Sequence, residues 1–240
     1  MQQTTYTLLE NTLLAPAVYR MTLQGDTTAI TRPGQFVNLK LDGLFLRRPI
    51  SVCDWDENTL ILIYKVVGKG TAQMAEMKPG DTLDALAGLG NGYDISACPD
   101  RPVLVGGGVG VPPLYGLAKR LLAAGKKPSV ILGFNRVDEI FYDMEFAALG
   151  LSVAVTTVDG SAGTKGYVTD AMKGGEYVCA CGPEPMLKAV HAKAAGGQFS
   201  FEARMGCGFG ACMGCTCKTI TGYKRICKEG PVMTKEEIIW

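Results

Sequence analysis

The residues best suited to chemistry in this chain are cysteines that gather near its C-terminal end. Of nine cysteines in 240 residues, four fall within eleven positions (Cys207, Cys212, Cys215 and Cys217), and Cys227 follows. Taken without Cys217, they give the spacing C-x4-C-x2-C-x11-C, whose first three members match the plant-type pattern of [2Fe-2S] ligands. The spacing therefore predicts that Cys207, Cys212, Cys215 and Cys227 bind a [2Fe-2S] cluster.

Zinc is the alternative metal for four cysteines. Zinc sites of that kind usually contain two C-x2-C pairs, whereas this segment contains one. A loop around a cluster must also fold back so that its N–H groups approach the sulfurs, and this requires backbone freedom. Glycines supply that freedom at Gly206, Gly208, Gly210 and Gly214. The pattern thus favours an iron-sulfur cluster over zinc.

The remaining cysteines and the single histidine predict no chemistry of their own. Cys53, Cys98 and Cys179 have no metal-site spacing, so we expect small, buried, apolar side chains. His191 is the only histidine, so the chain could form at most one site for histidine-based hydrolysis or proton shuttling. We expect no catalytic side chain and a chemistry that depends on bound cofactors.

The charge balance and the lack of long apolar runs limit the binding partners and the cellular location that we expect. The chain has 24 Lys plus Arg against 23 Asp plus Glu and no basic run, which disfavours binding to nucleic acid. The N-terminal residues do not resemble a signal peptide, and no stretch approaches the roughly 18 apolar residues of a membrane span. We therefore expect a soluble protein of the reducing cytoplasm, without a membrane partner.

Short strands separated by turn residues predict an all-β domain over residues 1–98. Segments such as QFVNLKL, RPISVCDW and TLILIYKVV mix β-branched with polar positions, as in a β-barrel or sandwich. One short helix interrupts them, with Thr71 as its expected N-cap and Pro79-Gly80 as its stop.

Strand and helix patterns alternate from about Pro102 onwards. PVLVGGG, SVILGF, LSVAVTTV and YVCACG read as strands, and VPPLYGLAKRLLAAG and PEPMLKAVHAKAA read as helices. This alternation predicts a parallel sheet with helices on both faces, over residues 99–198. Beyond Gly196-Gly197 the pattern ends, and we expect residues 199–240 to be a loop rich in glycine and cysteine.

Residues suited to phosphate binding occur in the all-β domain. Arg48 offers a guanidinium for a pyrophosphate, and the Ser51 hydroxyl follows three positions later. The glycine-flanked start of the short helix adds N–H groups and a helix dipole that attract anions. Together they predict a cradle for two phosphates.

A glycine turn occurs where the first strand of the α/β domain meets its helix. Gly107, Gly108 and Gly110 permit close backbone approach, although Val111 stands where the dinucleotide fingerprint has its third glycine. A tight turn without a ligand is the alternative interpretation.

Four segments in order, RPIS, GKGT, GGGVGVPP and CGPEPM, resemble the ferredoxin-NADP reductase superfamily. The resemblance implies an FAD-binding β-barrel followed by a Rossmann-like nicotinamide-binding α/β domain. With MGCGFGACMGC and ICKEGPV, the chain is similar from end to end to one branch, the electron-transfer subunits of NAD-dependent dihydroorotate dehydrogenase B. That branch implies FAD, a [2Fe-2S] cluster and NAD as cofactors.

The resemblance also implies cofactor-binding residues. FAD would be bound by Arg48, Pro49, Ile50, Ser51, Ile63, Tyr64, Lys65, Gly70 and Thr71, and the nicotinamide nucleotide by Gly107, Gly108, Gly110, Cys181, Gly182 and Pro183. The superfamily often has tyrosine at the position of Ile50, which can pack against a flavin ring but cannot stack on it. Cys181 is either near the hydride path or a buried thiol at a strand end.

A reaction and a partner follow from the same resemblance. An FMN-containing dihydroorotate dehydrogenase catalytic subunit would oxidise dihydroorotate to orotate in pyrimidine biosynthesis, in a heterotetramer with two subunits of each kind. Electrons would pass through the cluster and FAD to NAD, entering near the C-terminal segment. Asn135-Arg136 follows the second strand of the α/β domain, where an arginine also suits a 2′-phosphate, so NADP stays open.

Two other functions are consistent with these patterns. A small subunit of a sulfide dehydrogenase or of an NADH-dependent ferredoxin:NADP oxidoreductase would keep the cofactors and change the partner. A zinc-stabilised binding module would contain zinc and no FAD. Visible absorption separates the module from the flavoproteins, and the partner subunit separates the flavoproteins from one another.

Cys217 lies two residues beyond Cys215 and competes with it for one ligand position. We expect Cys215→Ser to abolish the visible absorption of the cluster and Cys217→Ser to retain it, because only Cys215 fits the spacing. Absorption spectra and iron content of the purified variants test this. Equal loss in both would contradict the assignment.

Overall fold

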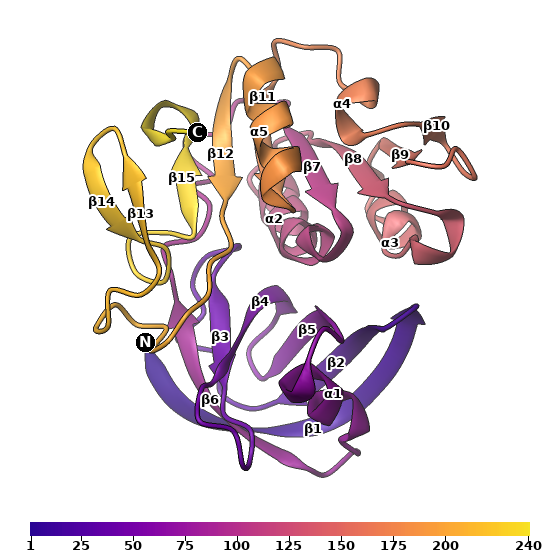
Figure 1. Ribbon diagram of the computed structural model, residues 1–240. Coiled ribbons are helices and arrows are strands. Elements are labelled where there is room, and N and C mark those ends of the chain that lie inside the picture. The colour runs from indigo at the N-terminus through magenta and orange to yellow at the C-terminus, as the bar shows by residue number, and fades with distance from the viewer.

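The computed structural model describes residues 1–240 and begins with a closed antiparallel β-barrel (Figure 1). Its strands follow the order β1-β2-β5-β4-β3-β6 around the barrel. The elements of this part are β1 (Gln2–Ala15), β2 (Val18–Gln24), β3 (Phe36–Leu39), β4 (Arg48–Trp55), β5 (Thr59–Lys65), α1 (Lys69–Glu76) and β6 (Thr82–Leu89). The barrel predicted for the N-terminal part is confirmed.

Alternating side chains explain why these segments form a barrel. Along β6, Leu83, Ala85, Ala87 and Leu89 are buried, and the residues between them are more exposed. A period of two sends one set of side chains into the barrel and the other outwards. The inner set forms one apolar core, in which Tyr6 is fully buried.

Helix α1 begins three residues earlier than the sequence indicates. Its N-cap is Gly68, so the expectation that Thr71 is the N-cap is wrong. Thr71 occupies the third helical position, where its hydroxyl oxygen accepts the N–H groups of Val67 and Gly68 at 2.9 and 3.2 Å. The hydroxyl therefore closes the turn before the helix, and the first-turn N–H groups stay available to a ligand.

A seven-stranded sheet forms the second part of the molecule, in the order β10-β9-β8-β7-β11-β12-β15. All neighbours are parallel except β15, which runs antiparallel to β12. The elements from β7 to β12 are β7 (Val103–Gly107), η1 (Gly108–Gly110), α2 (Val111–Ala123), β8 (Ser129–Phe134), η2 (Val137–Glu139), α3 (Asp143–Ala148), β9 (Val153–Thr157), β10 (Thr164–Lys165), α4 (Val168–Ala171), β11 (Tyr177–Cys181), α5 (Glu184–Lys193) and β12 (Gly196–Ser200).

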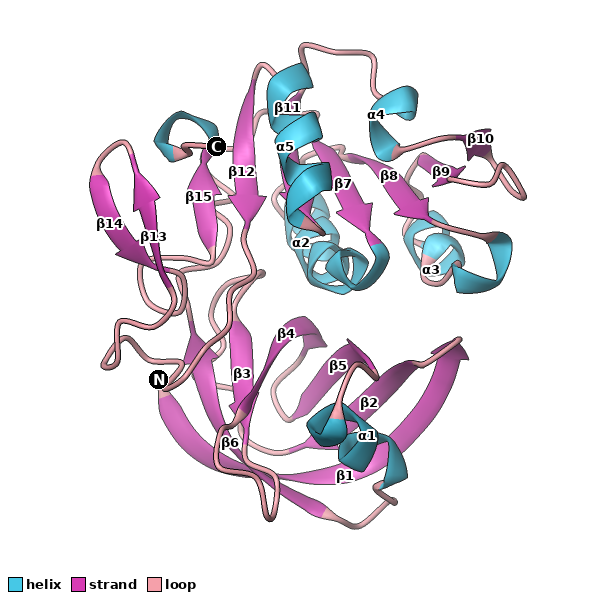
Figure 2. Cartoon of the chain, viewed as in Figure 1, coloured by secondary structure: helices cyan, strands magenta, loops and turns pink.

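Helices cover both faces of this sheet, as expected (Figure 2). One apolar core joins α2 and α3 to one set of strand residues, including Leu104 and Leu132. A second core joins α4 and α5 to the alternate set, including Val105 and Ile131. None of the helices is both long and apolar enough to cross a membrane.

The C-terminal segment contains more regular structure than the sequence suggests. Residues 201–215 carry no helix or strand, but β13 (Thr216–Thr219) and β14 (Gly222–Arg225) form a hairpin. β15 (Val232–Thr234) then pairs with β12, and η3 (Lys235–Glu237) follows. The expectation of loop throughout is wrong because a strand of three residues forms only against a partner, which the local sequence does not reveal.

Helix α2 joins the two parts by packing on β4. A Cβ atom at Gly116 would lie 2.5 Å from the carbonyl oxygen of Cys53, so only glycine allows this approach. Asp54 forms ion pairs with Lys119 and, at 3.3 Å, with Arg120. The Arg120 guanidinium lies 3.4 Å from the centre of the Trp55 ring. The strand and helix are therefore held by backbone contact and by charge.

Removing the Asp54 carboxylate tests this junction. We expect Asp54→Ala to lower the free energy of unfolding by about 1–3 kcal/mol, because Arg120 loses its partner at a partly buried position and the exposed Lys119 loses less. Chemical denaturation measures the change. Glu10→Ala, which removes an exposed pair with Arg20 at 4.0 Å, is the control and should change stability by less than about 0.5 kcal/mol. Equal effects would contradict this role for Asp54.

Candidate functional site

The four predicted cluster ligands lie in the structure as two pairs. The N–H of Cys212 donates to Cys207 Sγ at 3.4 Å, and the N–H of Cys207 donates to Cys212 Sγ at 3.5 Å. Cys227 donates its N–H to Cys215 Sγ, also at 3.4 Å. No three ligand-type side chains converge on one point as for a single ion. Two pairs are the arrangement a [2Fe-2S] rhomb requires, because each iron takes two thiolates.

Backbone N–H groups lower the pKa of Cys207, the first predicted ligand. Burial opposes ionisation of Cys207, but hydrogen bonds from the N–H groups of Cys212, Phe209 and Ala211 lower its pKa to about 6. At the inner pair, burial and the neighbouring Cys215 raise the pKa of Cys227 to about 12. A bound cation would stabilise the Cys227 thiolate and so offset the effects of burial and of Cys215 on its pKa. The four sulfurs therefore fit a cluster of two irons.

Three side chains outside the cysteine motif position this loop. Arg225 donates from Nη1 to the carbonyl of Gly210 at 2.6 Å and is itself held by Glu229, whose Oε2 accepts its Nε at 2.9 Å. From the barrel, Asn38 Nδ2 donates to the carbonyl of Cys207 at 3.2 Å. Sequence reasoning missed all three, and Asn38 carries no local signal because it lies 169 residues from its partner.

None of the five other cysteines forms a hydrogen bond with a predicted ligand, although Cys217 packs against the apolar core that contains Cys215 and Cys227. Cys217 lies in β13 opposite Lys224, and none of its hydrogen bonds joins it to another cysteine. Cys53, Cys98 and Cys179 are buried, as expected of small apolar residues. Cys181 is partly exposed at the end of β11.

The residues predicted to form a phosphate cradle in the barrel lie together in the fold. A Cβ atom at Gly70 would lie 2.2 Å from Arg48 Nε, so the arginine packs directly on the first turn of α1. A guanidinium and the positive end of a helix face the same place, an arrangement that an anion stabilises. The residues present therefore fit the pyrophosphate of FAD.

Strand β5 presents its three predicted residues in different directions. Ile63 packs in the core between barrel and sheet, and Lys65 is exposed. Tyr64 points into the barrel, where its hydroxyl donates to Asn11 Oδ1 at 3.1 Å and its ring stacks on Tyr19. Any contact of Tyr64 with a flavin would therefore come from its backbone. Ile50, on β4, packs against the barrel core.

The cluster loop lies against the strand pair that carries the flavin motif. In the register of β3 and β4, Asn38 is the partner of Pro49, and Asn38 is the side chain that binds the Cys207 carbonyl. A Cβ atom at Gly208 would lie 2.3 Å from Asn38 Nδ2. The fold thus brings the RPIS strand and the first cluster ligand together.

The two turns expected beside the nicotinamide also meet. They end the neighbouring strands β7 and β11, where Gly106 pairs with Cys181. A Cβ atom at Gly110 would lie 2.2 Å from the carbonyl oxygen of Cys181, and one at Gly107 would lie 2.5 Å from Met186 Sδ. Gly110 therefore allows one turn to pack on the other, Gly107 faces the flexible end of Met186 in α5, and Gly108 has open space around it and a φ of +51°. Pro183 is the N-cap of α5.

The thiol of Cys181 is neutral in this setting. Burial raises its pKa to about 12, against a hydrogen bond with Ser200 that lowers it. At neutral pH it offers an S–H group rather than a thiolate.

The arginine that follows β8 is already paired. Arg136 Nη2 donates to Asp138 Oδ2 at 2.8 Å, and Glu139 accepts the side-chain amide of Asn135 at 2.8 Å. Two carboxylates therefore lie at the strand end where a 2′-phosphate would bind, and they disfavour an additional negative charge.

Comparisons with known proteins agree with this geometry. A family profile described as the iron-sulfur cluster binding domain of dihydroorotate dehydrogenase B matches residues 202–239, and one described as an oxidoreductase NAD-binding domain matches residues 104–192. The electron transfer subunit of dihydroorotate dehydrogenase B (NAD(+)) from Fusobacterium nucleatum is 44% identical, over 97% of this chain and 96% of its own length. The Bacillus caldolyticus subunit of the same description is 43% identical, over 97% of both chains.

Solved structures show the same architecture. The structure of an NADH-dependent reduced ferredoxin-NADP oxidoreductase superposes with a TM-score of 0.88 at 32% identity, covering 98% of this chain and 90% of that one. A ferredoxin NADP+ reductase from Neisseria gonorrhoeae superposes with a TM-score of 0.68 at 17% identity, covering 80% and 90%, and supports the fold alone.

The chain is a flavoprotein oxidoreductase of the ferredoxin reductase type, with FAD and NAD as cofactors. Its barrel brings Arg48 against helix α1, and its parallel sheet brings two glycine-containing turns together. The paired cysteines add an iron-sulfur cluster to that class. Identity above 40% over nearly the full length is more specific still. The chain belongs to the family of dihydroorotate dehydrogenase B electron transfer subunits.

Arg48 and its neighbour Arg47 offer a matched test of the flavin cradle. Arg47 is bound to Asp84 and donates to the carbonyl of Asn38 at 3.3 Å, so it is a structural residue of the barrel. We expect Arg48→Ala to raise the dissociation constant for FAD roughly 10- to 100-fold, through loss of a charge-assisted hydrogen bond, and Arg48→Lys to fall in between. Arg47→Ala should leave FAD affinity unchanged and lower stability.

Fluorescence titration of the apoprotein with FAD measures these affinities. Weaker binding in Arg47→Ala than in Arg48→Ala would contradict the cradle.

Proposed function

We propose that this chain transfers electrons from an FMN-containing dihydroorotate dehydrogenase catalytic subunit to NAD, in pyrimidine biosynthesis. The observation that carries the proposal is 44% identity over nearly the whole length to a subunit of that description, combined with cysteine pairs beside the RPIS strand. The curated relatives are themselves described as electron transfer subunits, which supports a catalytic partner for this chain.

The proposed site residues divide by cofactor. Those for FAD are Arg48, Pro49, Ile50, Ser51, Ile63, the Tyr64 backbone, Lys65, Gly70 and Thr71; those for the nicotinamide nucleotide are Gly107, Gly108, Gly110, Cys181, Gly182 and Pro183; and those for the cluster are Cys207, Cys212, Cys215 and Cys227. The corresponding domains are residues 1–98, 99–198 and 199–240. When bound, the cluster exchanges single electrons and FAD exchanges hydride with the nicotinamide.

The side chains of this protein bind and orient the cofactors rather than transfer protons. Arg48 and the first turn of α1 neutralise phosphate charge, and the N–H groups of Ala211 and Cys212 donate to Cys207 Sγ at 3.2 and 3.4 Å. The protonated thiol of Cys181 offers a neutral, polarisable contact beside the nucleotide turn. Asn38 keeps the cluster loop against the strand that carries the flavin motif.

The proposed docking surface for the catalytic subunit is the C-terminal segment. The proposed complex contains two subunits of each kind and is located in the cytoplasm. Electrons have to enter near the cluster, and large apolar side chains are exposed there. Phe209 and Met213 belong to the cluster loop, and Ile220 and Tyr223 belong to the β13-β14 hairpin, with Tyr223 75% exposed. Such exposed apolar side chains are typical of a protein contact.

One other function has support from a structural neighbour. The NADH-dependent reduced ferredoxin-NADP oxidoreductase shares 32% identity and the same architecture, so a subunit of a complex of that kind would keep these cofactors. The 44% identity to the dihydroorotate dehydrogenase subunit favours the first proposal.

Co-purification tests the function directly. Tagged chain expressed in its native host should bring down a subunit that contains FMN, and the complex should reduce NAD with dihydroorotate. Tyr223→Asp should weaken the complex, whereas Tyr167→Asp, a 66% exposed tyrosine beside α4, should not. A complex that reduces NAD with sulfide or reduced ferredoxin, but never with dihydroorotate, would overturn the proposal.

A further inference from the structure

Two buried cysteines that no cofactor uses lie in contact with each other. Cys98 Sγ and Cys179 Sγ are 3.7 Å apart, although the residues are 81 positions apart in the chain. Cys98 belongs to the segment that connects β6 to β7, and Cys179 is the central residue of β11. They are 3% and 0% exposed. The fold thus places a dithiol where the connection between barrel and sheet meets the sheet.

Gln198 organises the surroundings of this dithiol. It lies on β12 as the register partner of Cys179, and its Nε2 donates to Cys98 Sγ at 3.5 Å. The same side chain binds both backbone groups of Asp94, accepting the N–H at 2.7 Å and donating to the carbonyl at 2.9 Å. The turn that carries Cys98 is therefore fastened to the strand beside Cys179, which keeps the two sulfurs together.

The two thiols differ electrostatically. The hydrogen bond from Cys179 lowers the pKa of Cys98, against the effect of burial, and the charge of Lys126 acts in the same direction. The pKa of Cys179 is raised by its bond to Cys98 and by burial. The pKa values of the two thiols therefore shift in opposite directions, and a lowered pKa makes a thiol more reactive toward peroxide.

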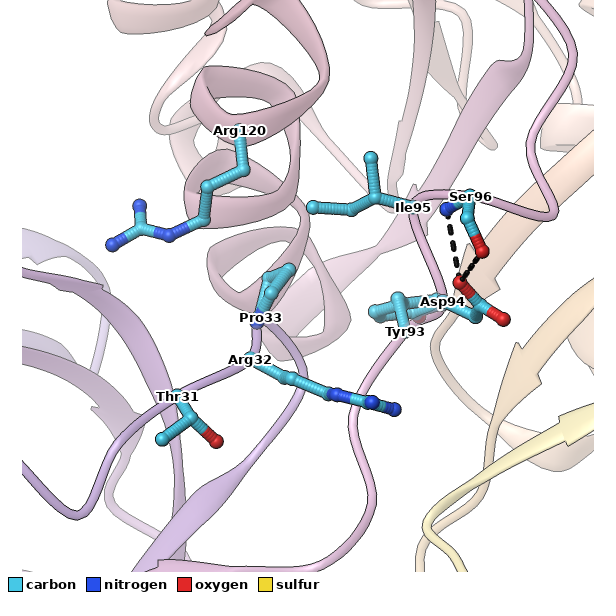
Figure 3. A pocket seen from close by; sticks show the side chains of 8 residues that line it. All are labelled: Thr31, Arg32, Pro33, Tyr93, Asp94, Ile95, Ser96 and Arg120. Atoms are coloured by element: carbon cyan, nitrogen blue, oxygen red, sulfur yellow. Dashed lines mark hydrogen bonds between the residues drawn. The ribbon is translucent and has the colours of Figure 1, made fainter. Parts of the chain in front are cut away.

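A pocket reaches the same turn (Figure 3). It has a volume of about 250 Å³ and is lined by Thr31–Pro33, Tyr93–Ser96 and Arg120. Asp94 is one of the lining residues, and its carbonyl oxygen contacts Cys98 Sγ at 3.5 Å. The pocket therefore borders the turn that carries Cys98, although neither cysteine lines it.

We propose that Cys98 and Cys179 are an oxidant-responsive pair that hydrogen peroxide converts to a disulfide. The Cys98 thiolate attacks one peroxide oxygen, the O–O bond breaks, and hydroxide leaves as the sulfur becomes a sulfenic acid. Cys179 sulfur then attacks Cys98 sulfur, the S–O bond breaks, and water leaves after proton transfer from the Cys179 thiol. Two thiols lose two electrons in total, and one peroxide gains them to give two waters.

Formation of the bond requires little movement. The sulfurs must close from 3.7 Å to about 2.05 Å. The product would link the barrel-to-sheet connection covalently to β11, two residues before the nucleotide turn at Cys181. It would close a long loop in the unfolded chain and so stabilise the fold.

The test treats the holoprotein with hydrogen peroxide, then denatures it, alkylates free thiols and maps the cysteine peptides by mass spectrometry. We expect a Cys98–Cys179 cross-link in most chains, reversed by dithiothreitol, and a melting temperature higher by roughly 5 °C than that of the reduced protein. Peptide mapping separates this link from any disulfide formed by the cluster cysteines.

Two variants complete the experiment. Cys98→Ser should remove the cross-link and the thermal shift while FAD and cluster absorption are retained. Cys53→Ser, which changes a buried cysteine without a thiol neighbour, should retain the link. The proposal is overturned if both cysteines remain alkylated as thiols after peroxide treatment of the wild type, or if Cys179 links to a cluster cysteine instead.

Discussion

The packing of α2 on β4 is the contact on which the rest of this structure depends. The carbonyl of Cys53 approaches Gly116 so closely that no Cβ fits, and Asp54 anchors the next turn of the helix through Arg120. β4 carries Arg48 at its other end, and α2 starts at the glycine turn of the sheet. One rigid contact therefore relates the phosphate cradle to the nucleotide turn, whereas a flexible linker would leave their separation undefined.

The cysteine segment is held in place by its neighbours. Asn91 Nδ2 binds the carbonyls of Glu229 and Val232 at 3.0 and 2.7 Å, and β15 completes the sheet beside β12. Asn38 holds the other end of the segment against the barrel. The cysteine segment is thus fastened to the barrel through Asn38 and to the sheet through β12.

The groups around the cysteine loop also bear on the charge that a bound cluster would add. An oxidised [2Fe-2S] centre on four thiolates adds a net charge of about −2, so the loaded protein differs from the +1 of the bare chain. Cationic side chains lie beside this loop, since a Cβ atom at Gly210 would lie 2.6 Å from Lys228 Cδ and 3.3 Å from Arg225 Nη1. Arg225 is itself paired with Glu229, so Lys228 and the N–H donors to sulfur are the groups that offset the charge of the cluster.

The sequence by itself determined the features that depend on local order. Cysteine spacing identified an iron-sulfur segment, strand and helix periods identified a barrel followed by a covered parallel sheet, and motif order identified the superfamily. Local signals are incomplete at two places: the sequence indicates a helix start at Thr71, whereas Gly68 is the N-cap, and it gives no sign of strand β15.

Only the tertiary structure decided which distant residues meet. Asn38 reaches Cys207, Gly110 packs on Cys181, and Cys98 touches Cys179. The physical reason is that such contacts follow from strand order and register, which depend on how whole faces pack together, whereas periodicity and spacing describe neighbours along the chain alone. The residue types and their spacing therefore indicate the kind of chemistry, and the tertiary structure determines how the residues are arranged in space.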